Sequence, residues 1–163
     1  MELNLQRKKH DLEDWRQLVE STKNVKKEVN IGIVGKYFTT GDFNLGDSYI
    51  SVIEAAKHAG FVNRVRPNIH WINAEEVEEK GGRILKEYDG IIVPQGWGSR
   101  GSEGKIRAIK YCREHNVPYF GLCYGMQMAV IEFARNVCGF KDAHSVEVEP
   151  TTPHSVIHIM PDQ

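Results

Sequence analysis

A lone cysteine between two glycines is the residue of this sequence best placed to do chemistry. Cys123 lies in the run YFGLCYGMQ, residues 119–127, where a short apolar stretch leads into an amphipathic one. Gly121 and Gly125 leave room for a tight strand-to-helix turn. This layout is typical of a nucleophile elbow with sulfur in place of serine. The turn would lift the sulfur out of the sheet edge, and the helix start would favour the reactive thiolate.

The alternative for any free cysteine is a small buried hydrophobe, and we interpret Cys112 and Cys138 in that way. The two glycines around Cys123 favour the nucleophile there.

A glycine-rich stretch, PQGWGSRG at residues 94–101, offers a partner for such a nucleophile. Acyl transfer from an amide passes through an oxyanion, which two aligned N–H groups stabilise. In an elbow one donor belongs to the residue after the nucleophile, here Tyr124, and the other to a neighbouring loop. Gly96 is the natural second donor because no side chain blocks its approach. The alternatives are a phosphate-binding loop, for which the lysine and spacing of a P-loop are missing, and an ordinary turn.

A cysteine nucleophile also needs a base, usually a histidine held by a third group. Downstream of Cys123 lie three histidines, none followed at the second position by an acid: His144, His154 and His158. We interpret them as loop or core residues. His58, His70 and His115 fall on predicted helices or strands, away from the expected site. The machinery visible in this sequence is therefore half complete.

Alternating strands and helices must position these residues. Residues 11–22 predict an amphipathic helix with one apolar stripe, which must pack against this domain or a partner, and residues 23–28 a polar linker. The predicted strands are residues 29–34, 68–72, 90–93 and 117–122. The predicted helices are a segment from Asp47 or Ser48 to Gly60, a weaker one at 75–86 interrupted by Gly81 and Gly82, 103–115 and 125–137. The inward faces are expected at Tyr49, Val52, Ile53 and Ala56, at Ile106, Ile109 and Cys112, and at Met126, Ala129, Val130, Phe133 and Val137.

Strictly alternating elements of this length indicate an α/β fold, a parallel sheet flanked by helices on both faces. Ligands of such sheets bind beyond the carboxyl ends of the strands, where residues 94–98 and Cys123 both fall. After Val137 the alternation stops and no closing helix follows, so we expect a C-terminally incomplete domain.

Composition narrows the class further. The chain has 163 residues, of which 40% are hydrophobic and 26% charged, values typical of a globular protein. Its formal net charge of −1 gives no electrostatic reason to expect binding to nucleic acid. Three widely spaced cysteines form neither a disulfide framework nor a zinc pattern and favour a reducing compartment. The charged N-terminus has no apolar signal core, and no stretch approaches a membrane span. We expect a soluble, cytoplasmic protein.

At this point the sequence resembles the glutamine amidotransferase domain of the CTP synthases, a class I amidotransferase with a catalytic triad. The elbow GLCYGMQ at 121–127 and PQGWGSRGSEGKI at 94–106 carry the resemblance. VIEFARNV at 130–137 and TPHSVIHIMPDQ at 152–163 match the CTP synthases in particular. DLEDWRQLV at 11–19 resembles their linker helix, so the resemblance implies a linker over residues 1–28 and a partial, flavodoxin-like amidotransferase domain over 29–163.

The resemblance also implies roles for individual residues. Cys123 matches the nucleophile that attacks the glutamine carboxamide, and Gly96 and Tyr124 match the donors of the oxyanion hole. Gly125 and Gln127 fall in the segment that contacts glutamine. Glu147 matches a glutamate that binds the substrate α-amino group; taken alone it reads as a solvated loop charge.

In the whole enzyme, the resemblance implies, a cysteine thioester forms and ammonia passes to a synthetase domain of the same polypeptide, where ATP activates UTP for amination to CTP. The ATP, UTP and magnesium sites belong to that domain, so no cofactor is expected in this chain. GTP activates the family, and its members are tetramers.

Several positions depart from the family pattern. The His-x-Glu pair of the triad has no counterpart before Gln163, Gln95 replaces a usual glycine, and Tyr124 replaces a usual leucine. The loop at 38–48 is about five residues longer than usual, and His144 and His158 replace other polar residues. We expect glutamine turnover near background because the histidine is missing.

Two other hypotheses remain open. One is a non-catalytic module that binds glutamine or a regulatory partner. The other is a cysteine hydrolase of the peptidase and deglycase-like group, in which a histidine usually follows the elbow cysteine at the position held here by Tyr124.

Overall fold

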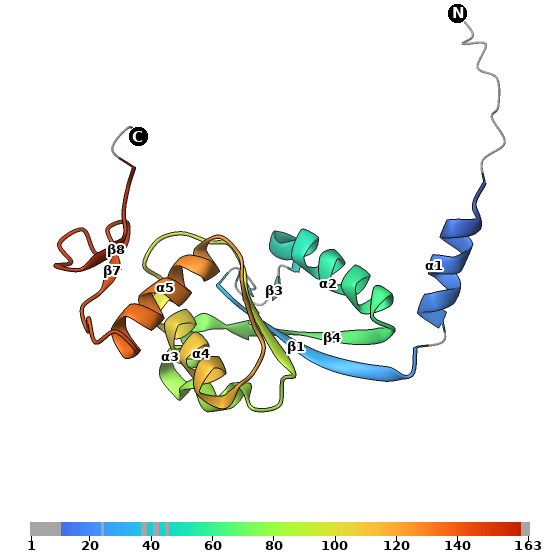
Figure 1. Ribbon diagram of the computed structural model, residues 1–163, viewed down its shortest axis with the longest axis horizontal. Coiled ribbons are helices and arrows are strands. Elements are labelled where there is room, and N and C mark those ends of the chain that lie inside the picture. The colour runs from blue at the N-terminus through green and yellow to red at the C-terminus, as the bar shows by residue number, and fades with distance from the viewer. Residues whose placement is uncertain (1–10, 24, 37–38, 41–42, 45, 161–163) are drawn as a thin grey trace, which may run out of the picture.

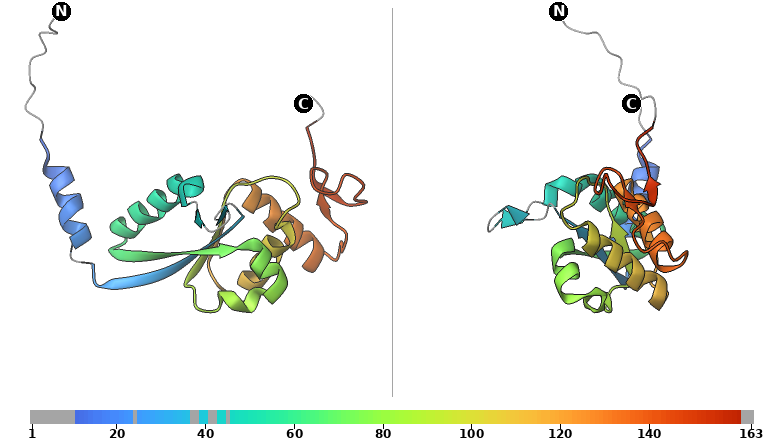
Figure 2. Two further views of the ribbon diagram at one scale, coloured as in Figure 1. Left: turned by 180° about the vertical axis from the view of Figure 1, so that it is seen from behind. Right: turned by 90° about the vertical axis from the view of Figure 1, so that its left-hand side faces the viewer.

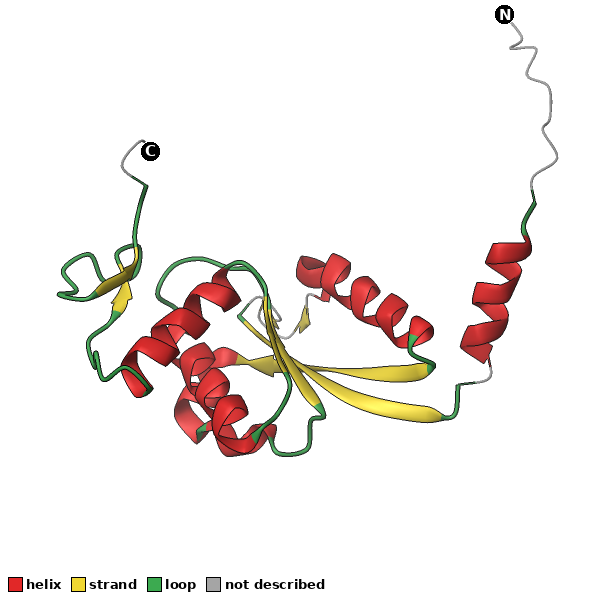
Figure 3. Ribbon diagram, viewed as in Figure 1, coloured by secondary structure: helices red, strands yellow, loops and turns green. Residues whose placement is uncertain are grey.

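The computed structural model describes residues 11–23, 25–36, 39–40, 43–44 and 46–160. Its centre is a four-stranded parallel sheet in the order β4-β1-β5-β6 (Figures 1 and 3). The strands are β1 (Lys27–Gly35), β4 (Val65–Asn73), β5 (Gly90–Val93) and β6 (Tyr119–Gly121). The prediction of a parallel α/β sheet is confirmed.

Helices cover both faces of this sheet, as the alternating pattern predicts. On one face α2 (Ile50–Val62) packs Val52 and Ile53 against Ile33. On the other face lie α3 (Ala74–Lys80), α4 (Ser102–His115) and α5 (Tyr124–Asn136), whose apolar side chains meet Val34, Ile72, Ile91 and Val93. β1 is apolar on both sides because both of its faces are covered.

Several boundaries differ from the sequence prediction. β4 begins at Val65 rather than at residue 68, and β6 spans only Tyr119–Gly121 of the predicted residues 117–122. β1 begins at Lys27, so the polar linker is shorter than residues 23–28, and α2 continues past Gly60 to Val62. No side chain caps α2, because the 3₁₀ turn η1 (Gly46–Tyr49) runs into it and Tyr49 is its N-cap residue.

The interruption expected at Gly81 is present: α3 ends at Lys80, and the short 3₁₀ helix η2 (Gly82–Leu85) follows. Within the longer loop at 38–48, the described residues form the antiparallel pair β2 (Thr39–Thr40) and β3 (Phe43–Asn44).

The inward face predicted for α5 is wrong. Four of the five residues expected inside are 42–56% exposed: Met126, Val130, Phe133 and Val137. The buried residues of α5 are instead Tyr124, Gly125, Met128, Ile131, Glu132 and Ala134. Cys112 is buried as predicted, whereas Cys138, also predicted buried, is exposed at the point where the chain leaves α5. Val52, Ile53, Ile106 and Ile109 are buried, as predicted.

Helix α1 (Glu13–Lys23) lies beyond the amino ends of β1 and β4, at the opposite end of the molecule from the short pair β7 (His144–Ser145) and β8 (Ser155–Ile157) (Figures 1 and 2). None of its residues is buried, and Trp15 is 66% exposed. The apolar stripe seen in the sequence therefore faces outward along most of its length. Among the described helices none is long and apolar enough to cross a membrane.

Close packing between α3 and α4 depends on one glycine. A Cβ at Gly104 would lie 1.7 Å from the carbonyl oxygen of Ala74, so the helices could not stay at their present separation. We predict that Gly104→Ala lowers the free energy of unfolding by about 1–3 kcal/mol, the usual cost of overpacking. Urea denaturation measures this change.

The matched control is Gly90→Ala, whose Cβ would meet its nearest neighbour at 3.4 Å, an ordinary contact. Its stability should stay close to that of the unsubstituted protein, and equal losses in the two variants would contradict the packing explanation.

Candidate active site

Cys123 occupies a strained backbone position between β6 and α5. Its φ is 52° and its ψ −105°, a left-handed conformation that residues with a side chain rarely adopt. The residue is exposed and is the N-cap of α5. Such strain at a sharp strand-to-helix turn is the geometry of a nucleophile elbow. The arrangement expected from the sequence is therefore present.

The two flanking glycines permit this turn. A Cβ at Gly125 would lie 2.0 Å from the carbonyl oxygen of Val93, and one at Gly121 would lie 2.6 Å from the hydroxyl of Tyr119. The backbone of the elbow therefore packs directly on the end of β5. The same closeness brings the elbow to the loop that follows β5, because the amide of Leu122 donates to the Val93 carbonyl at 2.9 Å.

That loop, residues 94–101, is the glycine-rich loop predicted to face the cysteine. A Cβ at Gly96 would stand 3.7 Å from the Cδ1 atom of Tyr124, so Gly96 and the first residue of α5 are neighbours. Gly98 has a φ of 71°, which favours glycine. The structure thus brings Gly96 and Tyr124 together beside Cys123, and Gln95 is exposed next to them.

Sequence reasoning missed the side chain of Tyr124, for which it considered only the backbone amide. The side chain is buried, and its hydroxyl donates to the Gly98 carbonyl at 2.6 Å. Two lysines face its ring, with Lys105 Nζ 4.9 Å and Lys36 Nζ 5.8 Å from the centroid. Lys36 also donates to the Trp97 carbonyl. Tyr124 and Lys36 therefore both donate hydrogen bonds to backbone carbonyl groups of the glycine-rich loop.

Lys105 is fully buried, and its ammonium has no hydrogen-bond partner among the described residues. Burial, followed by repulsion from Lys36, lowers the pKa of Lys105 to about 8. The pKa of Lys36 is also lowered, by burial and then by Arg100, while Glu147 and Glu75 act in the opposite direction. Two positive charges therefore lie under the loop, and the ring of Tyr124 faces both of them.

Glu147 reaches the same loop from a distant part of the chain. Its Oε1 atom accepts a hydrogen bond of 2.9 Å from the amide of Gly98, and its own amide donates to Ser145 Oγ at 3.2 Å. The side chain is otherwise exposed. Nothing in the local sequence shows this contact, because 49 residues separate the partners.

Gln127 lies in the first turn of α5, partly buried. Its Oε1 atom is buried and has no hydrogen-bond partner in the part of the chain that the structure describes. A buried amide oxygen without a partner is costly, and a ligand or a water molecule would satisfy it.

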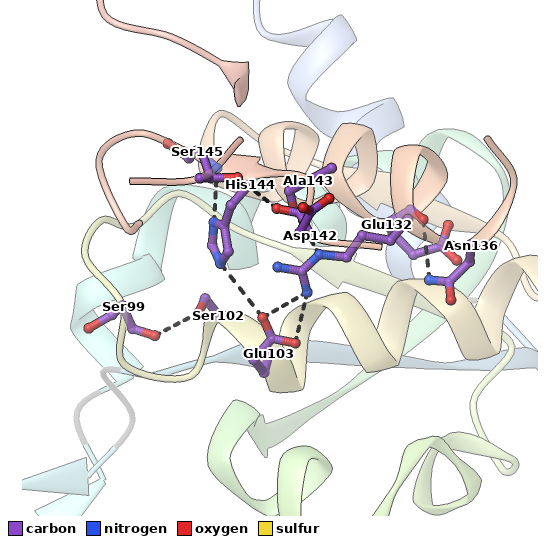
Figure 4. Close-up of polar contacts among 11 residues, drawn as sticks. Ser99, Ser102, Glu103, Glu132, Asn136, Asp142, Ala143, His144 and Ser145 are labelled. Carbon is purple, nitrogen blue, oxygen red and sulfur yellow. Dashed lines mark hydrogen bonds and ion pairs between the residues drawn. The ribbon is translucent and has the colours of Figure 1, made fainter. Parts of the chain in front are cut away.

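No histidine of the described ranges forms a hydrogen bond with Cys123. His154 pairs with Asp142 at 2.7 Å, and His158 Nδ1 contacts the Ile159 carbonyl at 2.7 Å. His144 is buried, and its Nε2 atom lies 3.6 Å from Glu103 Oε1 (Figure 4). Burial and then Arg135 lower the pKa of His144, and Glu103 and Glu149 oppose that shift. Within the same ranges, no group of three or more histidine, cysteine or acidic side chains could hold a metal ion.

The fold is that of the class I glutamine amidotransferases. Residues 44–158 match the family "Glutamine amidotransferase class-I", and the chain belongs to it. Its sequence is also similar to CTP synthases. It is 52% identical over 161 residues to that of Thermococcus gammatolerans, covering 99% of this chain and 29% of the relative. It is 56% identical over 154 residues to that of Carboxydothermus hydrogenoformans, covering 94% and 28%.

A solved structure of a related protein is also similar to this chain. The glutaminase domain of Trypanosoma brucei CTPS with bound acivicin superposes with a TM-score of 0.73 at 41% identity, over 82% of this chain and 51% of that one. The present chain spans less than a third of the length of the curated relatives it matches.

Proposed function

We propose that this chain is the glutamine-hydrolysing part of a CTP synthase and that Cys123 forms a thioester with glutamine. The observation that carries the proposal is the exposed cysteine at a strained strand-to-helix turn, with the glycine-rich loop packed beside it. The similarity to CTP synthases supports the choice of glutamine.

In the proposed mechanism the Cys123 thiolate attacks the carboxamide carbon of glutamine and forms a carbon–sulfur bond. The carbonyl electrons move to oxygen, and the amides of Gly96 and Tyr124 stabilise the oxyanion. The oxyanion then collapses, the carbon–nitrogen bond breaks, and the nitrogen takes a proton and leaves as ammonia. Water hydrolyses the γ-glutamyl thioester to glutamate and restores the thiol.

Three further groups would bind the substrate in this mechanism. The free oxygen of Glu147 is suited to the substrate ammonium, because the other oxygen already accepts from Gly98. The buried oxygen of Gln127 and the backbone at Gly125 lie in the first turn of α5, next to the cysteine.

The rest of the proposed enzyme lies outside this chain. The outward apolar stripe of α1 supports residues 1–28 as a linker that packs on the synthetase domain, with 29–163 as a partial amidotransferase domain. ATP, UTP and magnesium would act in that synthetase domain, and ammonia would pass to it. Activation by GTP, a tetrameric assembly and a cytoplasmic location belong to the same proposal.

Protection from alkylation tests the proposed glutamine site. Iodoacetamide should modify Cys123 and Cys138, which are exposed, and spare Cys112, whose pKa burial raises to about 12. L-glutamine should slow alkylation of Cys123 and leave that of Cys138 unchanged. Helix α5 separates the two sulfurs by about 20 Å along its axis. Peptide mass spectrometry measures both rates.

N-acetyl-L-glutamine is the matched ligand control, because it keeps the carboxamide for Cys123 but has no ammonium for the Glu147 carboxylate. Equal slowing of Cys123 alkylation by L-glutamine and N-acetyl-L-glutamine, or none by either, would overturn the glutamine site.

Ammonia release separates an active fragment from a non-catalytic glutamine-binding module. We predict release from L-glutamine close to that of Cys123→Ala, because no described histidine is hydrogen-bonded to the sulfur. General acid–base help of the missing kind is worth about 10²–10⁴-fold. A coupled glutamate dehydrogenase assay measures the rate, and robust turnover that depends on Cys123 would contradict this prediction.

A further inference from the structure

The segment that carries Glu147 is anchored to the helices through Arg135. Nε of Arg135 donates to the carbonyl oxygen of Ala143 at 2.7 Å, and Nη1 donates to both carboxylate oxygens of Glu103, at 2.8 and 3.0 Å (Figure 4). The Arg135 side chain is only 17% exposed, whereas that of its partner Glu103 is 41% exposed, so the guanidinium is the buried half of the pair. One guanidinium thus joins α5, α4 and the start of the segment 143–149.

His144 completes this anchor. Its Nδ1 atom accepts from the amide of Ser145 at 2.9 Å, so a neutral ring carries its proton on Nε2, which lies 3.6 Å from Glu103 Oε1. Ala143, His144 and Ser145 are all buried. Three consecutive residues just before Glu147 are therefore held in place.

A tight turn transmits this constraint to Glu147. The carbonyl of Ser145 accepts from the amides of Val148 and Glu149 at 3.1 and 2.9 Å. The hydroxyl of Ser145 accepts from Glu147, and the Glu147 carboxylate reaches Gly98. Arg135 and Cys123 belong to the same helix, one inside it and one at its N-cap. The helix that carries the sulfur is thus the helix that holds the carboxylate.

We propose that Arg135 is a positioning residue that sets the spacing between the Glu147 carboxylate and the Cys123 sulfur. This inference rests on the proposed function. The spacing selects an α-amino acid whose ammonium and side-chain carboxamide are separated as in glutamine. Asparagine is shorter by one methylene, so under this proposal it does not reach both groups at once. Loosening the anchor should therefore weaken glutamine binding and reduce the preference for glutamine over asparagine.

A second ion pair between the same helices provides a matched control. Arg113 Nη2 lies 2.8 Å from Glu132 Oε1, and Glu132 is 1% exposed, so this pair also joins α4 to α5. Arg113 is in the last turn of α4, whereas Glu103 is in the first turn, next to the glycine-rich loop. Arg113→Met therefore removes a helix–helix contact without touching the Glu147 segment, and it should lower stability at least as much as Arg135→Met because it leaves the buried Glu132 unpaired.

The experiment measures, in the 163-residue chain, how much L-glutamine or L-asparagine halves the alkylation rate of Cys123 by iodoacetamide. The variants are Arg135→Met, Arg135→Lys, Glu103→Gln and Arg113→Met, with urea denaturation of each. We expect Arg135→Met to raise the half-protecting glutamine concentration about tenfold and to reduce the preference over asparagine. Arg135→Lys keeps the positive charge but lacks the several fixed N–H donors of a guanidinium, so it should recover only part of the lost glutamine affinity. Glu103→Gln should shift the concentration in the same direction, and Arg113→Met should leave it unchanged.

The alkylation rate without amino acid should stay unchanged in every variant, because Arg135 does not contact Cys123. An unchanged half-protecting concentration in Arg135→Met, or an equal rise in Arg113→Met, would overturn the positioning role. If Arg135→Met does not fold, Arg135→Lys and Glu103→Gln decide the matter by the same criterion. If glutamine does not protect the unsubstituted chain, the proposed function fails and this inference fails with it.

Discussion

The contact between the elbow and the end of β5 is the constraint on which the rest of the site depends. Parallel pairing of β5 with β6 sets Val93 opposite Gly121, and the Val93 carbonyl then accepts from Leu122. Gly125 packs so closely on this carbonyl that no other residue fits. The chain must therefore turn at Cys123, which takes a backbone conformation costing about 1–3 kcal/mol. Packing of β5, β6 and α5 offsets that strain and keeps the sulfur exposed.

The polar parts of the site are arranged around this turn. Tyr124 supports the glycine-rich loop from one side through Gly98, and Glu147 contacts the amide of the same glycine. Lys105 and Lys36 place positive charge below the loop, where burial disfavours it. Buried positive charge is unfavourable for folding and favourable for an anion formed nearby. The site is thus built partly at the expense of stability.

Much of the fold followed from local pattern. β5 and α4 lie within one residue of their predicted bounds, because a β-branched run before Pro94 and a regular apolar stripe at Ile106, Ile109 and Cys112 leave little choice. α5 shows where pattern fails. It has two apolar stripes, and the buried one contains Glu132, a residue type that is rarely buried without a partner. Only the tertiary pairing with Arg113 makes its burial acceptable.

The site, like the fold, has parts that local sequence predicts and parts that it does not. The elbow and the glycine-rich loop could be predicted because their glycines are adjacent in sequence to what they permit. The contact of Glu147 with Gly98, the support from Lys36 and Tyr124, and the anchor at Arg135 join residues 8 to 61 positions apart. No spacing rule shows such contacts, and the resemblance to a family supplied only Glu147.

The most direct test of this account compares the unfolding free energies of Cys123→Gly and Cys123→Ala. Both variants lack the sulfur, but only glycine adopts a φ of 52° with a ψ of −105° without strain. Cys123→Gly should be more stable than Cys123→Ala by about 1 kcal/mol or more, although glycine gains more freedom in the unfolded chain. A glycine variant that is less stable than the alanine variant would show that the backbone at residue 123 is relaxed and that the elbow does not exist.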